Sequence, residues 1–193
     1  MSLLLETIKI EDGTINNLSY HQTRFNTSRK ELFNIREEID LATLIQAPKT
    51  GLYRCRIVYD KKVHTVEYIP YVPKEIKKIK IVTSNIEYDY KYANREKLNT
   101  LRERERDFDE IIIEKEGYLT DITIANIAFY DGDKWLTPSQ ALLPGTMRAK
   151  LLDEGFLHKK EIRKEDLKNY SQIALMNSMI GFKVLNIDPA QIR

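Results

Sequence analysis

The stretch EYDYKYANREKLNTL, residues 87–101, places Lys91 between two tyrosines and just ahead of a predicted helix. The chain contains 31 lysines and arginines, and most such residues are solvated surface charges. Asn94 can cap a helix that extends to about Asp107, with Leu98 and Leu101 on one face. Lys91 therefore lies in a loop before a regular element, where a lysine can carry chemistry or be a solvated surface charge.

The predicted elements on both sides of this stretch mix helices and strands. Upstream, the patterns predict a strand over 3–10, a helix over 18–33 that Ser19 can cap, a helical piece over 37–45 and a hairpin over 51–71. Downstream, they predict a strand over 76–85, three strands over 109–138, a helix that ends at Gly155 and two strands around 177–181. The fold class is therefore α+β.

A change of pattern marks a domain boundary. The segment PYVPKEIKK has two prolines three residues apart, and such punctuation is typical of a linker. We expect a small α/β domain over residues 1–72 and a larger α+β domain over 73–193 that carries Lys91.

Composition excludes several classes of protein. Apolar residues make up 42% and charged residues 31% of 193 residues, which is an ordinary globular balance. The formal charge of +2 and the interleaved acids and bases argue against a nucleic-acid-binding protein. The single cysteine, Cys55, lies in an alternating run typical of a packed strand and fits a reducing compartment. With no signal peptide and no long apolar run, we expect a cytoplasmic protein that does not contact a membrane. The scattered histidines indicate no metal site.

Several groups could carry chemistry. The run LPGTMRAK places Gly145 and Thr146 at the opening of a helix, where free backbone N–H groups favour an anion such as phosphate. The run LTDITIAN offers Asp121 with Asn126 five residues later, and LSYHQTRF offers Arg24 on a helix. Each of these, taken alone, could equally be a structural or surface residue.

Together, the order and spacing of these motifs resemble the class IV aminotransferase family, the fold-type IV pyridoxal-phosphate enzymes. The matching segments are ETIKIEDG, LSYHQTRF, KYANR, TDITIANIAFYDG, LTPSQALLPGTMR and LMNSMIG. They extend from about Leu4 to Gly181, which is nearly the whole chain. The resemblance implies a two-domain fold like that of D-amino-acid aminotransferase, here trimmed at its N-terminus, with pyridoxal 5'-phosphate between the domains.

The resemblance also implies roles for individual residues. Lys91 would be the Schiff-base lysine and the proton shuttle. Asp121 would pair with the pyridine nitrogen, and Arg24 would clamp the phosphate. The backbone N–H groups of Thr146 and Met147 and the Thr146 hydroxyl would bind the same phosphate, and Asn126 would brace this region.

The sequence departs from the family pattern in three places. The family usually has glutamate where this chain has Asp121, the chain begins almost at the ETI strand, and the segment between Arg24 and Lys91 is short. The chemical core is therefore retained while the part that recognises substrate is altered. For a substrate carboxylate, the strand YRCRIVY offers Arg54 and Arg56 on one face, although both could also be surface residues.

The motifs near Lys91 leave the reaction open. KYANRE and GTMR favour a 4-amino-4-deoxychorismate lyase of folate biosynthesis, which would release pyruvate and p-aminobenzoate. The alternative is an aminotransferase acting on a D- or branched-chain amino acid, and a non-catalytic cofactor-binding relative is a further alternative. The resemblance implies an amino-acid-like small-molecule substrate and a homodimer.

Overall fold

The computed structural model describes residues 2–193, which form two compact units. The first unit extends to Pro73 and also includes Tyr90–Asn94, whereas the second contains Lys74–Asp89 and Arg95–Arg193. The placement of Lys91 differs from the expectation that the larger domain carries it, because its segment pairs with the first strand of the chain. The expected boundary between residues 72 and 73 stays a prediction.

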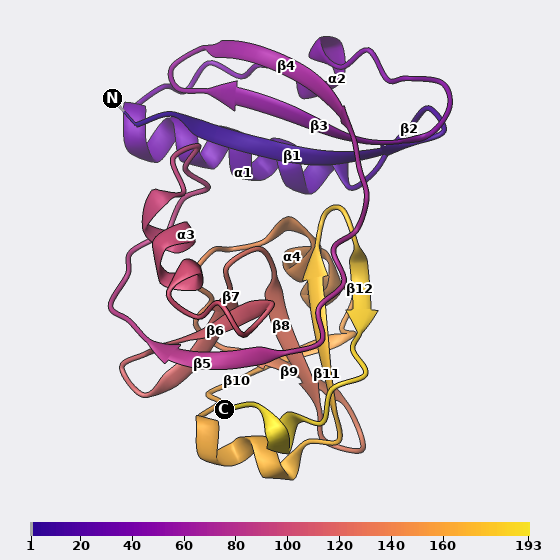
Figure 1. Cartoon of the computed structure of the whole chain (residues 1–193). Coiled ribbons are helices and arrows are strands. Elements are labelled where there is room, and N and C mark those ends of the chain that lie inside the picture. The colour runs from indigo at the N-terminus through magenta and orange to yellow at the C-terminus, as the bar shows by residue number, and fades with distance from the viewer. Residues whose placement is uncertain (1) are drawn as a thin grey trace. The chain divides into compact units, whose positions relative to one another are not determined.

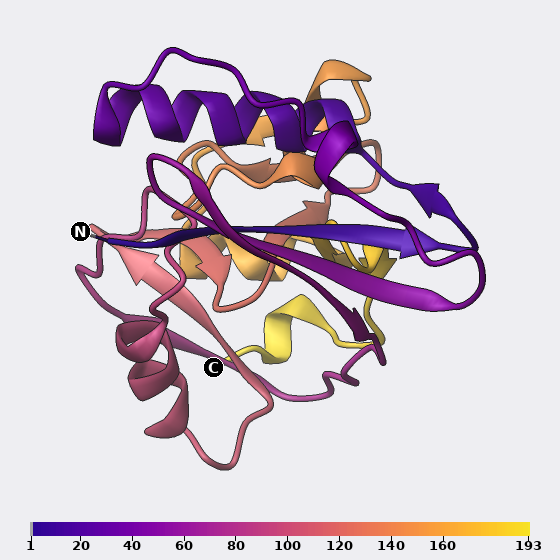
Figure 2. The same ribbon diagram turned by 90° about the horizontal axis from the view of Figure 1, so that it is seen from above.

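The first unit is an antiparallel sheet with a long helix. Its elements are β1 (Leu4–Glu11), β2 (Thr14–Ile15), α1 (Leu18–Phe33), α2 (Leu41–Leu44), β3 (Leu52–Tyr59) and β4 (Val63–Pro70). The strand order is β2-β1-β3-β4, and α1 runs beside this sheet (Figures 1 and 2). The buried residues of α1 include His21, Phe25 and Ser28, whose spacing places them on one helical face.

The Lys91 segment completes the edge of β1. Strand β3 pairs with β1 along its whole length, whereas β2 pairs only with Ile10 and Glu11. At the other end of β1, Leu4 forms an isolated antiparallel bridge with Tyr92. This bridge holds the backbone next to Lys91 against the first strand of the chain.

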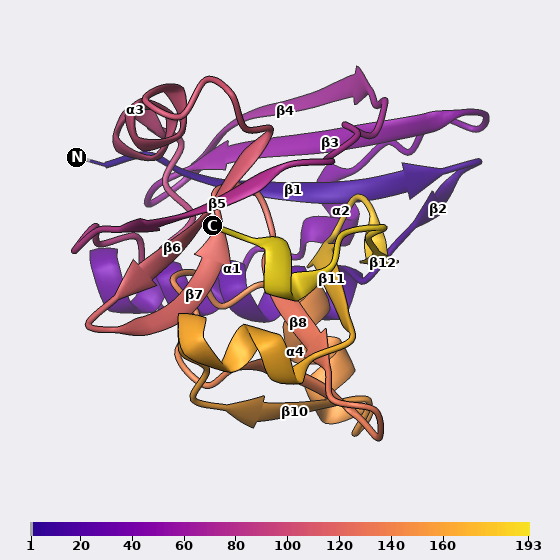
Figure 3. The ribbon, with the colours of Figure 1, turned by 60° about the horizontal axis from the view of Figure 1, so that its bottom comes forward.

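The second unit is built on a larger mixed sheet. Its elements are β5 (Ile79–Thr83), α3 (Glu96–Glu103), β6 (Glu110–Lys115), β7 (Tyr118–Ile122), β8 (Asn126–Tyr130), β9 (Trp135–Pro138), α4 (Thr146–Asp153), β10 (Leu157–Lys160), the 3₁₀ helix η1 (Lys164–Asn169), β11 (Gln172–Asn177), β12 (Gly181–Val184) and the 3₁₀ helix η2 (Pro189–Gln191). The main path of the sheet is β10-β9-β8-β7-β6-β5, and β11 joins β8 and β12. The C-terminal end lies beside β5, where the Ile81 N–H donates to the carbonyl of Arg193 (Figure 3).

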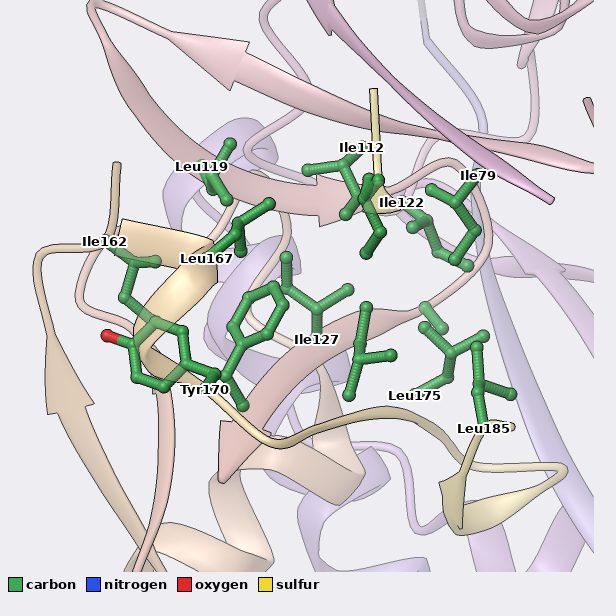
Figure 4. Close-up of a cluster of buried hydrophobic side chains, with 14 of the residues drawn as sticks. Ile79, Ile112, Leu119, Ile122, Ile127, Ile162, Leu167, Tyr170, Leu175 and Leu185 are labelled. Atoms are coloured by element: carbon green, nitrogen blue, oxygen red, sulfur yellow. The ribbon is translucent and has the colours of Figure 1, made fainter. Parts of the chain in front are cut away.

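An apolar core holds this sheet together. Figure 4 shows branched side chains from β6, β7, β8 and β11, among them Ile112, Ile122, Ile127 and Leu175, gathered into one cluster. These four are at most 2% exposed, and Tyr170 stacks on Phe129 at the edge of the cluster. Burial of such side chains is the main stabilising contribution, so the strands that carry the candidate site residues rest on a rigid support.

Four expected elements differ from the structure. The second helical piece is only α2, because the Asp40 side chain accepts from the Ala42 N–H and starts the helix there. Helix α3 begins after Arg95 rather than at Asn94, and α1 begins after Asn17, so Ser19 is not its cap. The expected single strand that contains Asp121 and Asn126 is two strands, β7 and β8, joined by a tight turn. In residues 2–193, no helix has both the length and the apolar character needed to cross a bilayer.

Candidate active site

Lys91 is held through its backbone. Its carbonyl oxygen accepts from the Leu5 N–H at 2.9 Å, and the Ala93 N–H donates to the Leu3 carbonyl at 2.8 Å. The lysine itself is half-buried. These two backbone hydrogen bonds fix the main-chain position from which the lysine side chain extends. A residue that holds a group covalently needs such a fixed position.

Next to this strand lies a cluster of three ionisable side chains, Glu6 from β1 and His21 and Arg24 from α1. Glu6 Oε1 accepts from Arg24 Nε at 2.9 Å, and Glu6 Oε2 accepts from Arg24 Nη2 at 2.6 Å. His21 Nδ1 lies 2.6 Å from Glu6 Oε2. Glu6 and His21 are fully buried, and the Arg24 side chain is 14% exposed.

The charges in this cluster follow from burial and pairing. Burial raises the pKa of Glu6, but the Arg24 charge and the hydrogen bonds from His21 and Arg24 outweigh it and lower that pKa to about 2. Burial lowers the pKa of His21; the bond to Glu6 opposes this, and the charges of Arg24 and Lys91 add to it. The effect of Lys91 on His21 indicates that the lysine amine and this cluster share one neighbourhood in the first unit.

Glu6 is the residue of this cluster that sequence reasoning did not single out. On β1 it alternates with Leu4, Ile8 and Ile10, which are fully buried on the same face. A carboxylate in the middle of an apolar row is an expensive choice unless a partner neutralises it. That break in the alternation is the signal by which Glu6 could have been found. His21 and Arg24 both contact Glu6 Oε2.

The second unit presents a different cluster, centred on Asp121. The turn after β7 returns the chain so that Asp121 faces Asn126 across the β7–β8 pair. Asp121 Oδ1 accepts from Asn126 Nδ2 at 2.8 Å, and Asp121 Oδ2 accepts from the Leu143 N–H at 2.9 Å. The spacing of five residues between Asp121 and Asn126 is thus a consequence of the hairpin.

The environment of Asp121 makes its carboxyl unusual. The side chain is buried, and burial raises its pKa to about 6 against the lowering effect of Asn126, Leu143 and the charge of Arg148. A carboxylate that is costly to ionise gains from a cationic partner such as a protonated ring nitrogen. Each of its oxygens has a second lone pair that could take such a bond.

The loop before α4 is tied to this carboxyl. Asn126 Nδ2 also donates to the Leu143 carbonyl at 2.9 Å, so one amide holds both Asp121 and the segment that leads to Gly145. Thr146 is the first residue of α4 and is buried, and Met147 is half-buried beside it. The first N–H groups of this eight-residue helix therefore lie at a position that Asn126 fixes.

Arg148 is a structural member of this region. Its Nη2 donates to the Pro138 carbonyl at 2.6 Å, and its Nε lies 3.3 Å from Thr137 Oγ1. Burial lowers the pKa of Arg148, and the Asp121 carboxylate opposes that shift. Arg148 joins the first turn of α4 to β9 and adds a positive charge near Asp121.

Arg54 and Arg56 do not join Arg24. Arg54 is opposite Lys9 in the β1–β3 register, so both arginines point to the sheet face away from Glu6 and the buried row. Arg56 Nη1 forms an exposed ion pair with Glu67 at 2.8 Å.

Cys55 is buried on the opposite side of β3, and burial raises its pKa to about 11, as expected of a packed thiol. Among residues 2–193, no three His, Cys, Asp or Glu side chains form a group that could hold a metal ion.

The first unit offers an amine and a guanidinium, and the second unit offers a buried carboxylate and a helix N-terminus. Enzymes that use an aldehyde cofactor with a phosphate employ groups of these kinds. The family model of amino-transferase class IV matches residues 3–187, and the chain belongs to this family. Its members are pyridoxal-phosphate-dependent enzymes, and pyridoxal phosphate is the cofactor.

Known proteins resemble the chain over nearly its full length. An uncharacterised protein of Haemophilus influenzae is 38% identical over 184 residues, covering 92% of this chain and 98% of that protein. The crystal structure of a candidate 4-amino-4-deoxychorismate lyase from Haemophilus somnus is 36% identical, with a TM-score of 0.86 and coverage of 94% and 98%. A candidate amino-acid aminotransferase from Mesorhizobium loti is 25% identical, with a TM-score of 0.75 and coverage of 95% and 98%. The expected α+β fold of the fold-type IV enzymes is confirmed.

The residues present fit the cofactor. Bound pyridoxal phosphate supplies an aldehyde that reacts with amines and a ring that accepts electrons. A buried carboxylate with a raised pKa suits the ring nitrogen, because a proton shared with that nitrogen removes the cost of ionisation. The side chain of Asp121 is one methylene shorter than glutamate, and Asn126 and Leu143 hold it in place.

Proposed function

We propose that the chain is a pyridoxal-phosphate-dependent 4-amino-4-deoxychorismate lyase, which releases pyruvate and forms p-aminobenzoate for folate biosynthesis. The observation that carries this proposal is the similarity to the Haemophilus somnus protein, which extends over 98% of that chain. The two proteins therefore share the short first domain, which is the part expected to recognise the substrate.

Lys91 would have the central chemical role. Its amine would hold the cofactor covalently and, when released, would remove the proton from the substrate carbon that bears the amino group. The C–O bond to the enolpyruvyl group then breaks, that group takes up a proton to leave as pyruvate, and the six-membered ring becomes aromatic. The backbone hydrogen bonds on both sides of this segment support a lysine whose main chain is fixed at the edge of β1.

The other residues would bind and orient the cofactor. Asp121 would accept from the pyridine nitrogen, and its hydrogen bonds to Asn126 and Leu143 would hold the carboxylate in place. Arg24 would bind the phosphate, together with the N–H groups of Thr146 and Met147 and the Thr146 hydroxyl.

The substrate carboxylate needs a cation as well. Of the two candidates, Arg56 is neutralised by Glu67, so Arg54 is the better one. Because Arg54 lies on the sheet face away from Arg24, its role would require a second copy of the chain, and the proposed assembly is a homodimer. Sedimentation of the cofactor-loaded protein tests the dimer, and a monomer at micromolar concentration would contradict it.

A second candidate function is transamination of a D- or branched-chain amino acid. The similarity to the candidate aminotransferase of Mesorhizobium loti over 98% of that chain favours it. Both reactions begin with the loss of a proton from the same type of carbon, so Lys91 and Asp121 serve either one.

The two functions are separated by their products. The cofactor-loaded protein is incubated with 4-amino-4-deoxychorismate, and p-aminobenzoate and pyruvate are measured together. The lyase predicts equimolar formation of both, abolished in Lys91→Ala and retained in Lys97→Ala, which changes an exposed lysine. Absence of both products from protein that retains bound cofactor would contradict the lyase, and release of a 2-oxo acid from an added amino acid would then establish the aminotransferase.

A further inference from the structure

The buried contact between Glu6 and Arg24 has no role in the function proposed above. A carboxylate without any exposed surface is rare in proteins and needs strong partners. Glu6 has two of them, Arg24 on both of its oxygens and His21 on Oε2. Such a carboxylate either neutralises a buried charge or holds a functional group in one orientation.

The geometry of the contact is that of a fork. Arg24 Nε and Nη2 lie on one edge of the planar guanidinium, and each donates to a different oxygen of Glu6, at 2.9 and 2.6 Å. A paired contact of this kind fixes the rotation of the guanidinium about its own axis, which a single hydrogen bond does not. The fork uses two of the five N–H donors of Arg24.

Glu6 is itself held from two sides. It belongs to β1, whose neighbours Leu4 and Ile8 are fully buried, so its backbone is part of the rigid sheet. His21 Nδ1 contacts Glu6 Oε2 at 2.6 Å and limits rotation of the carboxylate. Because burial lowers the pKa of His21, the imidazole is neutral near pH 7 and donates its N–H to Glu6.

We infer that Glu6 is a positioning residue, which orients the Arg24 guanidinium for the phosphate of the cofactor and is itself held by His21. This inference rests on the proposed role of Arg24. A guanidinium recognises phosphate through the direction of its N–H groups, so the loss of orientation weakens binding even when the positive charge remains.

The competing role of Glu6 predicts the opposite result. If Glu6 only neutralised Arg24, removal of its negative charge would leave Arg24 with more attraction for a phosphate dianion, and affinity would rise. Two variants distinguish the roles. Glu6→Gln removes the charge and keeps the size, whereas Glu6→Asp keeps the charge and withdraws it by one methylene from the fork.

The test compares two ligands that differ only in the phosphate. The full chain is stripped of cofactor and titrated with pyridoxal phosphate and with pyridoxal, and binding is followed by visible absorption. We expect Glu6→Gln and Glu6→Asp each to weaken pyridoxal phosphate about ten-fold, the size of one hydrogen bond to a charged group, and to change pyridoxal less than about two-fold. Glu67→Gln, which removes a surface carboxylate of the same unit, should change neither.

The inference is overturned by unchanged or tighter binding of pyridoxal phosphate in either Glu6 variant, or by equal weakening of both ligands. If Glu6→Gln does not fold, Glu6→Asp decides the question alone. Arg24→Lys separates this inference from the proposed function. If Arg24→Lys leaves the preference for the phosphate form intact, Arg24 is not the phosphate ligand and its proposed role is wrong. If Arg24→Lys lowers that preference and the Glu6 variants do not, only the positioning role is wrong.

Discussion

Asn126 and Gly145 are in such close contact that a Cβ atom on Gly145 would overlap the side-chain oxygen of Asn126. Gly145 has an ordinary backbone conformation, with φ of −73° and ψ of 142°, so glycine is needed here for space and not for backbone freedom. The same Asn126 amide donates to Asp121. The first turn of α4 and the Asp121 carboxylate are therefore linked through one side chain.

Gly145→Ala should disturb both ends of this link. The added methyl group must displace Asn126, which costs about 1–3 kcal/mol of unfolding free energy, as overpacking of a dense region usually does. Displacement of Asn126 also releases Asp121 and the start of α4, so affinity for pyridoxal phosphate should fall in the same variant. Denaturant unfolding and cofactor titration measure the two effects.

A double-mutant cycle identifies the cause of the Gly145→Ala effect. In an Asn126→Ala background the overlapping oxygen is absent, so Gly145→Ala should cost at least about 1 kcal/mol less than in the native chain. Gly155→Ala is the matched control, because its Cβ meets nothing within 4 Å and only its φ of +71° is unfavourable. Additive costs of the Gly145 and Asn126 changes would contradict the contact described here.

Asp121→Asn should change how stability depends on pH. The pKa of Asp121 is raised to about 6 in the folded chain from an ordinary value of 3.8, so its contribution to stability is full below pH 3.8 and is lost as the pH rises through 6. The cofactor-free native protein should therefore lose up to about 3 kcal/mol between pH 4 and 6.5 relative to Asp121→Asn, which cannot titrate.

The quantity to measure is the difference in unfolding free energy between these two proteins at several pH values. Asp131→Asn serves as control, because Asp131 is an exposed turn residue whose pKa is lowered by the backbone N–H groups of Lys134 and Asp133. A difference that does not vary with pH between 4 and 6.5 would show that Asp121 has no raised pKa.

Glu6 should change the pH dependence of stability in the opposite direction to Asp121, and at lower pH. The pKa of Glu6 is lowered from 4.5 to about 2, so its ionised form stabilises the fold above pH 4.5, and this contribution is lost as the pH falls toward 2. Native protein should lose up to about 3 kcal/mol over that range relative to Glu6→Gln. Measurement of the unfolding free energy at several acidic pH values, with Glu67→Gln as the control, would detect this loss. Parallel curves for the native chain and Glu6→Gln would refute it.

The sequence predicted the parts of the structure that local patterns encode. Alternation predicted β1 and the β3–β4 hairpin, and helical spacing predicted α1. The division of the run from Asp109 to Pro138 was predicted less well. The turn that separates β7 from β8 consists of Thr123, Ile124 and Ala125, so no glycine, proline, asparagine or aspartate marks it in the sequence.

The candidate site was also predicted only where local motifs encode it. The motif order singled out Lys91, Asp121 and Arg24, but it did not show that Glu6 holds Arg24 from 18 residues away. It also placed Lys91 in the larger domain, because pairing of a short loop segment with a strand more than 80 residues earlier depends on tertiary contacts. Arg54 and Arg56 were correctly placed on one face of β3, but nothing local shows that this face lies away from Arg24.

The proposed role of Lys91 is to hold the cofactor and to carry the proton. The most direct measurement is to load the protein with pyridoxal phosphate, reduce it with borohydride, digest it and locate the added cofactor mass by mass spectrometry. We predict the mass on the peptide that contains Lys91, and no adduct in Lys91→Ala, while Lys97→Ala behaves as the native chain. An adduct on another lysine, or one that persists in Lys91→Ala, would contradict the claim.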